Sequence, residues 1–211
     1  MLQLPVTVRI PTDGELTDRP DVDEILFRRR KAKIMEGYSL QLNNNPRLPY
    51  RFQAMVNIDN DRLWDLFLSL AETLPAKVSC AYGIYEEDNV TTPLLQKDFV
   101  LKELSKYMNE LTQECQLEAS MLFQTKDILI ELGISASKYI RYWGAELERF
   151  RLLMQSYDLP LIEGLEFIDE YPRIVTPLRD LVRTAKAPET VLYHLDQAFR
   201  IDRTPPEPFF D

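Results

Sequence analysis

The chain has few of the residues on which the common catalytic and metal sites depend. Among its 211 residues there are six glycines, two cysteines and one histidine. No glycines follow the GxGxxG or GxxxxGK[ST] spacing that cradles phosphate groups, which argues against a dinucleotide-binding or P-loop enzyme. Two distant cysteines and one histidine cannot supply the usual four ligands of a zinc site. We therefore expect no metal and no cofactor.

The single histidine, His194, would have to support any Ser-His-Asp or Cys-His mechanism alone. A general base needs a partner and a pocket, and no serine lies in a nucleophile-elbow pattern. We interpret His194 as a partly exposed structural residue of the last predicted helix. The sequence predicts no catalytic residue.

Long apolar runs are also absent. No stretch approaches the 18 apolar residues of a membrane-spanning helix, and the N-terminus has no basic region followed by a hydrophobic run, so we expect no signal peptide. Cys80 and Cys115 fall on the apolar phase of predicted strands, which favours two reduced core thiols, although neighbouring strands would permit a disulfide. We expect a cytoplasmic protein without membrane contact.

Acidic residues outnumber basic ones, 34 to 25, for a net charge of −9. Repulsion of phosphates argues against a nucleic-acid partner. The charge suits a basic protein partner, because opposite potentials speed encounter. A role in solubility alone is the preferred interpretation of the charge.

The length of 211 residues and the hydrophobic content of 45% fit one globular domain or two small ones. No clear linker divides the chain. We therefore predict a single α+β domain over residues 1–211, with residues 1–58 as a possible N-terminal subdomain. The proline-rich end, residues 203–211, is expected to be an extended tail.

The most legible stretch runs from Glu114 to Gly144 and predicts three consecutive strands. Apolar and polar residues alternate from Cys115 to Gln124, which is the period of a half-buried strand. A polar turn follows, and the alternation resumes at Ile128. Lys138–Trp143 is a third segment rich in β-forming residues. We predict a β-meander in this half of the chain.

The remaining strands and helices occur in runs and do not alternate regularly. Strands are predicted at 4–10, 38–42, 51–58, 77–85 and 165–168. Helices are predicted at 21–35, 60–74, 98–112, 145–157 and 189–200, with a helix start near 178. This order indicates an α+β fold with an antiparallel or mixed sheet and helices packed on one face. The segments 38–42 and 50–58 could form a hairpin.

Two charged segments are candidates for binding. Glu86, Glu87 and Asp88 end a predicted strand, where their carboxylates could meet a cationic surface, hold a divalent cation or simply be solvated. A second acidic cluster lies at residues 163–170, and solvation is the preferred interpretation for it. The basic run from Arg28 to Lys31 is likewise interpreted as a solvated helix face.

Aromatic residues are the remaining signal. Tyr139, Arg141 and Trp143 alternate along the third strand of the meander and therefore share one face of it. Tyrosine and tryptophan are enriched at binding hot spots, although core or cross-strand packing is the preferred interpretation for any one of them. The predicted partner-binding residues are Glu86, Glu87, Asp88, Tyr139, Arg141 and Trp143.

The second half of the chain resembles the small acidic α+β immunity proteins that neutralise bacterial polymorphic toxins or toxins of contact-dependent inhibition. The similarity covers about a quarter of the chain. It lies in the segments Ala119–Phe123, Ile128–Leu132 and Lys138–Trp143, followed by an acid-led helix at 146–157 and a short strand at 165–168. The resemblance implies a cytoplasmic bacterial protein that binds a toxin domain, and it assigns no individual contact residues.

Three functions follow as hypotheses. The first is a non-enzymatic binding protein, an immunity or inhibitor protein that covers a basic partner's active site. The second is a structural or assembly subunit of a phage or secretion machine, which would oligomerise. The third is a carboxylate- and metal-dependent enzyme centred on Glu86, Glu87 and Asp88, which we rank last because no second ligand cluster is visible.

Overall fold

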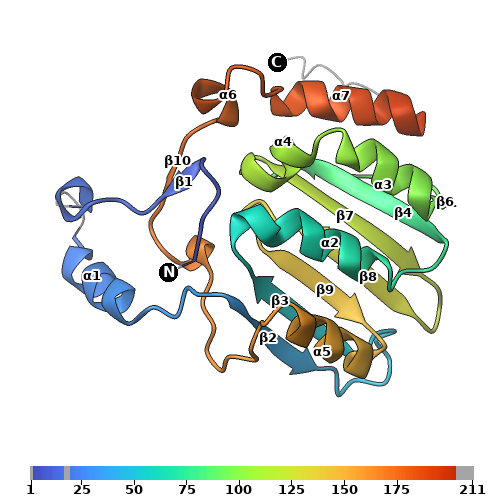
Figure 1. Cartoon of the computed structure of the whole chain (residues 1–211), viewed down its shortest axis with the longest axis horizontal. Helices are drawn as coiled ribbons and strands as arrows, with labels where there is room; N and C mark the ends of the chain where they lie inside the picture. The colour runs from blue at the N-terminus through green and yellow to red at the C-terminus, as the bar shows by residue number, and fades with distance from the viewer. Residues whose placement is uncertain (1, 17–19, 203–211) are drawn as a thin grey trace, which may run out of the picture.

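The computed structural model describes residues 2–16 and 20–202. Its main sheet has eight strands in the order β2-β3-β9-β8-β7-β4-β5, with β6 also paired to β4, and every pairing is antiparallel (Figure 1). In this order the strands are β2 (Gly37–Leu42), β3 (Phe52–Asn57), β9 (Ile140–Gly144), β8 (Leu129–Ile134), β7 (Leu117–Gln124), β4 (Lys77–Ile84), β5 (Val90–Thr91) and β6 (Leu95–Gln96).

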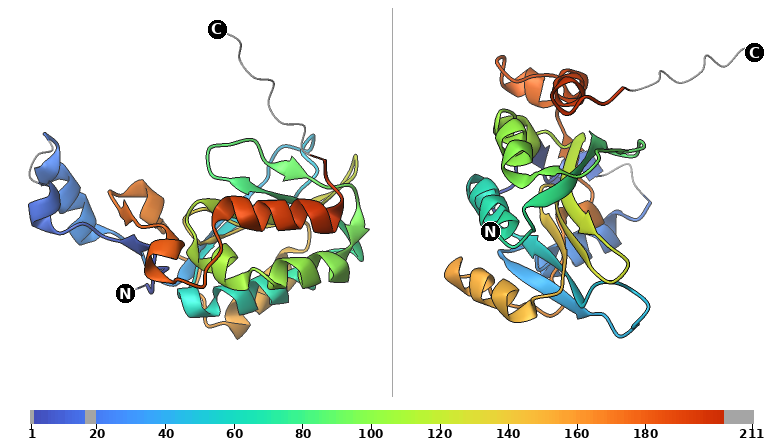
Figure 2. Two further views of the ribbon diagram at one scale, coloured as in Figure 1. Left: turned by 90° about the horizontal axis from the view of Figure 1, so that it is seen from above. Right: turned by 90° about the vertical axis from the view of Figure 1, so that its right-hand side faces the viewer.

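The helices that pack on this sheet lie on one side of it, as the right panel of Figure 2 shows. They are α2 (Leu63–Ala71), α3 (Lys97–Ser105), α4 (Met108–Gln113), α5 (Leu147–Ser156) and α7 (Pro188–Phe199). A short 3-10 helix, Asn60–Arg62, leads into α2. The predicted α+β fold, with helices on one face of a largely antiparallel sheet, is confirmed.

The core lies between the sheet and these helices. In β3, the buried residues Phe52, Ala54 and Val56 alternate with the half-exposed Gln53 and Met55. Successive strand side chains point to opposite faces, so one face of the strand enters the core while the other stays outside it. The same alternation recurs along β9 and at the start of β4.

The predicted meander and the predicted hairpin are both confirmed. β7, β8 and β9 are joined by the short connections 125–128 and 135–139, and β2 pairs with β3 over their whole length. Connections of this length cannot hold a helix, so the meander adds strands without covering either face. The covering helices come from the longer connections on either side of it.

Three shorter predictions are wrong. Residues 165–167 form no strand, and Ile168 begins the 3-10 helix Ile168–Glu170. The strand predicted at 4–10 is reduced to β1, Val8–Arg9. The segment after the predicted strand 77–85, interpreted from the sequence as a charged loop to about Gln96, contains β5 and β6, which pair with β4. Short segments like these take their structure from a distant partner, which local periodicity does not reveal.

The N-terminal residues are divided between two sheets. β1 pairs with β10 (Ile174–Val175) in a separate two-stranded sheet, whereas β2 and β3 belong to the main sheet. Around the small sheet lie the 3-10 helix Asp13–Leu16, α1 (Val22–Lys31) and α6 (Leu178–Leu181). Residues 1–58 therefore do not form one separate unit. The tail predicted at 203–211 lies outside the described residues.

The two cysteines are free and buried. β4 and β7 are neighbours, but Cys80 lies opposite Met121 in their ladder. Cys115 precedes β7 and belongs to a second small apolar cluster with Val8 and Ile168. The register therefore places the two thiols at different points, and no disulfide joins them.

Candidate functional site: the open face of the sheet

The open face is the side of the main sheet that the helices leave uncovered. Because the register is known, its side chains can be placed in rows that cross the strands. One row runs through Met55, Arg141, Gly133, Ser120 and Ala81. The next row runs through Gln53, Trp143, Glu131, Leu122 and Ser79.

Glu131 lies near the centre of the second row. Its backbone is directly opposite Trp143 on one side and Leu122 on the other. All three side chains are half-exposed. The Glu131 carboxylate has no ion-pair partner among the residues that the structure describes. The centre of the open face is thus an unpaired carboxylate flanked by an indole and an aliphatic side chain.

Arg141 is held in place on the same face. Its guanidinium is 2.7 Å from the carboxylate of Glu118, with 36% and 14% of the two side chains exposed. The residue opposite Arg141 on β8 is Gly133, which has no side chain that could cover the guanidinium. A half-exposed pair like this adds about 1 kcal/mol at most, so its main effect is to fix the direction of Arg141.

Tyr139 is not part of the open surface. Its ring packs on Phe167 with centroids 4.6 Å apart, and its hydroxyl donates to a carboxylate oxygen of Asp169 at 3.2 Å. Burial is the larger cause and the negative charge of Asp169 the next, and together they raise the pKa of Tyr139 to about 12. Tyr139 therefore ties the end of the sheet to the segment around residue 168, and the prediction that it shares a binding surface with Arg141 and Trp143 is not supported by its position.

The acidic loop is exposed but is not a neighbour of β9. Glu86, Glu87 and Asp88 follow β4, and β7 and β8 lie between β4 and β9. With strands about 4.8 Å apart, the three intervals amount to roughly 14 Å. The loop therefore forms a rim, and the six predicted binding residues do not form one contiguous patch.

The sequence analysis did not identify Glu131, Leu122, Met55 or Gln53 as candidates. Their alternation placed them away from the core. Their meeting on one surface depends on cross-strand register, which periodicity does not supply.

Lys138 is a buried group that sequence reasoning placed on a strand. It precedes β9 with φ +62°, is 4% exposed, and donates from Nζ to the carbonyl oxygen of Leu117 at 2.7 Å. Burial lowers the pKa of Lys138 to about 8, while Cys115, Glu114 and Glu118 act in the opposite direction. The site is enclosed, so we treat it as part of the structure and not as a binding surface.

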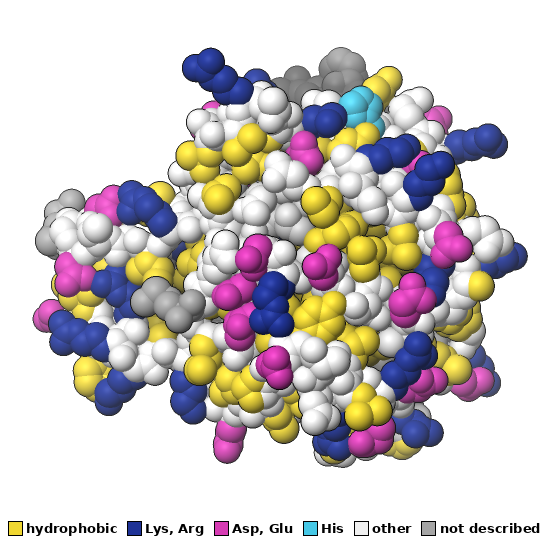
Figure 3. All heavy atoms as spheres, in the orientation of Figure 1, with side chains coloured by type: hydrophobic (Ala, Val, Ile, Leu, Met, Phe, Trp, Pro, Cys, Tyr) yellow, Lys and Arg dark blue, Asp and Glu magenta, His cyan; other side chains and the backbone are white. Residues whose placement is uncertain are grey.

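On the helix-bearing side, several acidic side chains gather around a basic one near the centre of the view, and apolar side chains lie between the charged ones elsewhere (Figure 3). His194 is half-buried on α7, with its ring 6.0 Å from that of Tyr107, and its Nδ1 has no hydrogen-bond partner within the described chain. Among the described residues no group of three or more His, Cys, Asp or Glu could hold a metal ion.

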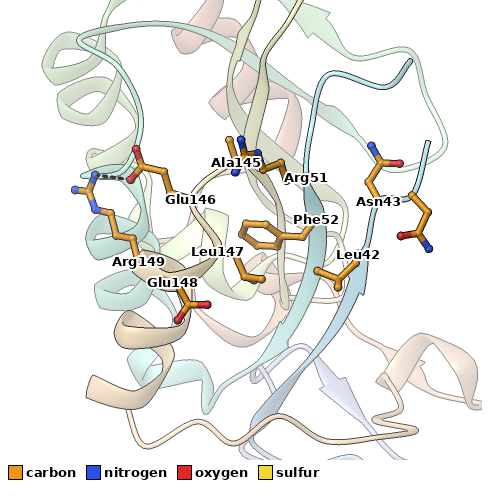
Figure 4. A pocket seen from close by; sticks show the side chains of 10 residues that line it. Leu42, Asn43, Arg51, Phe52, Ala145, Glu146, Leu147, Glu148 and Arg149 are labelled. Atoms are coloured by element: carbon orange, nitrogen blue, oxygen red, sulfur yellow. Dashed lines mark ion pairs between the residues drawn. The ribbon is translucent and has the colours of Figure 1, made fainter. Parts of the chain in front are cut away.

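A pocket of about 690 Å³ lies at the β2 edge of the sheet (Figure 4). Leu42, Phe52 and Leu147 form its apolar lining, and Glu146 is 3.6 Å from Arg149 at its rim. It opens beside the first turn of α5.

The fold and this surface define a class: an α+β protein whose antiparallel sheet is covered by helices on one face and open on the other. Comparison of the chain with protein-family models, with curated proteins and with solved structures found no match. Within the described residues, no helix is long and apolar enough to cross a membrane.

Proposed function

We propose that this chain is a non-enzymatic binding protein that uses the open face to hold a basic protein partner. The observation that carries the proposal is Glu131, a half-exposed carboxylate without an ion-pair partner among the described residues, placed between Trp143 and Leu122. In its most specific form the proposal is a cytoplasmic immunity or inhibitor protein that neutralises a toxin by covering its active site.

The chemistry of the cluster suits a lysine or arginine of the partner. The cationic group would pair with Glu131, while its aliphatic stem would pack on Leu122 and its charge on the face of the Trp143 indole. Such a contact becomes strong when the partner excludes water from it, because ion pairs are screened less in a desolvated site.

The rim would guide the encounter. Glu86, Glu87 and Asp88 are exposed after β4, which lies two strand positions from the Glu131 strand β8, and the chain as a whole carries a net charge of −9. Negative charge around a binding surface raises the association rate with a basic partner more than it raises affinity. The centre and the rim of the open face thus have separable kinetic roles.

The proposal predicts that Trp143→Ala or Glu131→Gln weakens the complex about 30-fold or more, mainly through faster dissociation. The partner is first sought among the products of neighbouring reading frames and by affinity capture, and the complex is then measured by surface plasmon resonance. Tyr193→Ala, which changes a 60% exposed tyrosine on the helix side, is the control. A partner that binds the Trp143 and control variants equally well would contradict the use of the open face.

Neutralising the rim should act on a different rate constant. Replacing Glu86 and Glu87 by glutamine and Asp88 by asparagine should slow association about threefold to tenfold at low salt and leave dissociation nearly unchanged. The effect should fade at high ionic strength, because exposed charges are screened beyond about 10 Å at 0.1 M salt. A change confined to dissociation would assign the loop to the contact itself.

A further inference from the structure

The β2 edge of the main sheet has backbone groups left over for pairing. In β2 the backbone N–H and C=O groups of alternate residues point toward β3 and bond to it. The backbone groups of Tyr38 point away from β3. Its N–H donates to the carbonyl oxygen of Pro160 at 2.9 Å, and its carbonyl accepts from the N–H of Ile162 at 2.9 Å. Because the direction of these groups alternates along a strand, the N–H and C=O of Leu40 and Leu42 also face outward.

These outward groups have no partner within the part of the chain that the structure describes. The contact with residues 160–162 ends at Tyr38, so the edge is free from Leu40 to Leu42. The opposite side of the sheet differs, because it ends in β5 and β6, each of two residues. Very short edge strands are a common way to block further pairing, whereas a free edge can accept another strand.

We propose that this edge pairs with the same edge of a second copy of the chain, as an antiparallel β2–β2 ladder about a two-fold axis at Gln41. In this register Leu40 of each copy lies opposite Leu42 of the other, and both pairs exchange N–H···O=C bonds. All the free outward groups of Leu40 and Leu42 are then satisfied, so the edge is self-complementary in the sense that a two-fold interface requires.

The side chains around the axis suit such a contact. Leu42 and Leu161 are 52% and 55% exposed at this edge, and the pocket of Figure 4, which has both apolar and charged lining residues, opens beside Leu42. On the opposite face, Gln41 is exposed and its Oε1 accepts from Nε2 of Gln53 at 2.7 Å. Pairing would extend this amide row across the axis.

The strands at this edge carry no negative charge that would oppose self-association. The chain is strongly acidic, but residues 37–58 contain no aspartate or glutamate and include Arg47 and Arg51. Two copies can therefore bring this edge together without placing β2 or β3 carboxylates against each other. Glu146 and Glu148 do line the pocket beside Leu42, but Arg51 and Arg149 line it too, and Glu146 is 3.6 Å from Arg149.

The pairing has a consequence for the shape of the assembly. A two-fold axis perpendicular to the sheet keeps the open faces of both copies on the same side. The two sheets of eight strands would become one continuous sheet with two open faces side by side. The β2–β2 pairing is independent of what the open face binds.

Engineered cysteines test the register. Gln41→Cys places identical residues opposite each other at a non-hydrogen-bonded position, where Cα atoms about 4.5 Å apart allow a disulfide. Ser39→Cys is the matched control on the same face, because the register separates its two copies by four residues, or about 13 Å. Cys80 and Cys115 are buried, so we expect neither of them to form the intermolecular disulfide that the test detects.

We expect mild oxidation to convert most of the Gln41→Cys variant to a covalent dimer on non-reducing gels and little of the Ser39→Cys variant. Light scattering of the unmodified chain at high micromolar concentration should give twice the chain mass of 24.8 kDa. Equal cross-linking at both positions, or a monomer at every concentration, would overturn the proposal.

A charge swap separates pairing from any effect on folding. Gln41→Lys and Gln41→Glu should each weaken the homodimer tenfold or more, because like charges face each other at the axis, and a mixture of the two should restore it. Thr91→Lys, at the exposed position of β5 on the other edge, should leave the mass unchanged. Failure of the mixture to recover the dimer would refute a two-fold at Gln41.

Discussion

Replacing Phe150 by alanine should lower the free energy of unfolding by about 4 kcal/mol. Phe150 is 1% exposed, and its ring lies 5.5 Å from that of Tyr38, 5.2 Å from Phe52 and 5.3 Å from Tyr142. Truncation removes buried apolar area and all three ring contacts, and it leaves a cavity that the rigid strands below cannot fill.

The measurement is urea unfolding followed by circular dichroism, with the slope of the transition checked for constancy. Leu152→Ala is the control, since Leu152 stands on the same helix and is 66% exposed. It should change stability by less than about 0.5 kcal/mol. A loss below about 1 kcal/mol for the Phe150 variant would mean that α5 does not anchor the β2 side of the sheet.

Lys138 should make stability rise with pH under alkaline conditions. Burial lowers its pKa from the ordinary 10.5 to about 8 in the folded chain. Between these two values the unfolded chain binds more protons than the folded one, so the free energy of unfolding increases with pH. The penalty for the buried charge is full below pH 8 and is relieved as the pH rises toward 10.5.

The comparison with Lys138→Met isolates this effect, because other alkaline titrations occur in both proteins. The wild type should gain about 2–3 kcal/mol relative to the variant between pH 7 and pH 10. Lys77→Met, at an exposed position of β4, should show no such pH-dependent gain. A stability difference that stays constant with pH would mean that Lys138 is not held in a desolvated site.

Much of the architecture was predictable from local pattern. The alternation from Cys115 to Phe123 and again after Ile128 predicted the meander, and the alternation of Phe52, Ala54 and Val56 predicted β3 and its partner. These segments are long enough for a period of two to be visible and to face a core on one side. The strand predicted at 165–168 failed because its apolar residues pack beside the sheet end and join no ladder.

The binding candidates were predicted less well, for reasons that differ by residue. Trp143 and Arg141 do face away from the core, as the period required. Tyr139 shares their phase but is covered by Phe167, a residue 28 positions farther along the chain. The acidic loop is exposed, but its distance from β9 depends on strand order.

The sequence by itself determined the strand and helix pattern, the strong negative charge and the scarcity of ligands for the common catalytic and metal sites. Only the tertiary structure decided that Glu131 lies between Trp143 and Leu122 and that the outward groups of Leu40 and Leu42 have no partner among the described residues. The physical reason is register. Local periodicity fixes which face a side chain occupies, whereas its neighbours on that face come from hydrogen bonding between segments far apart in the chain.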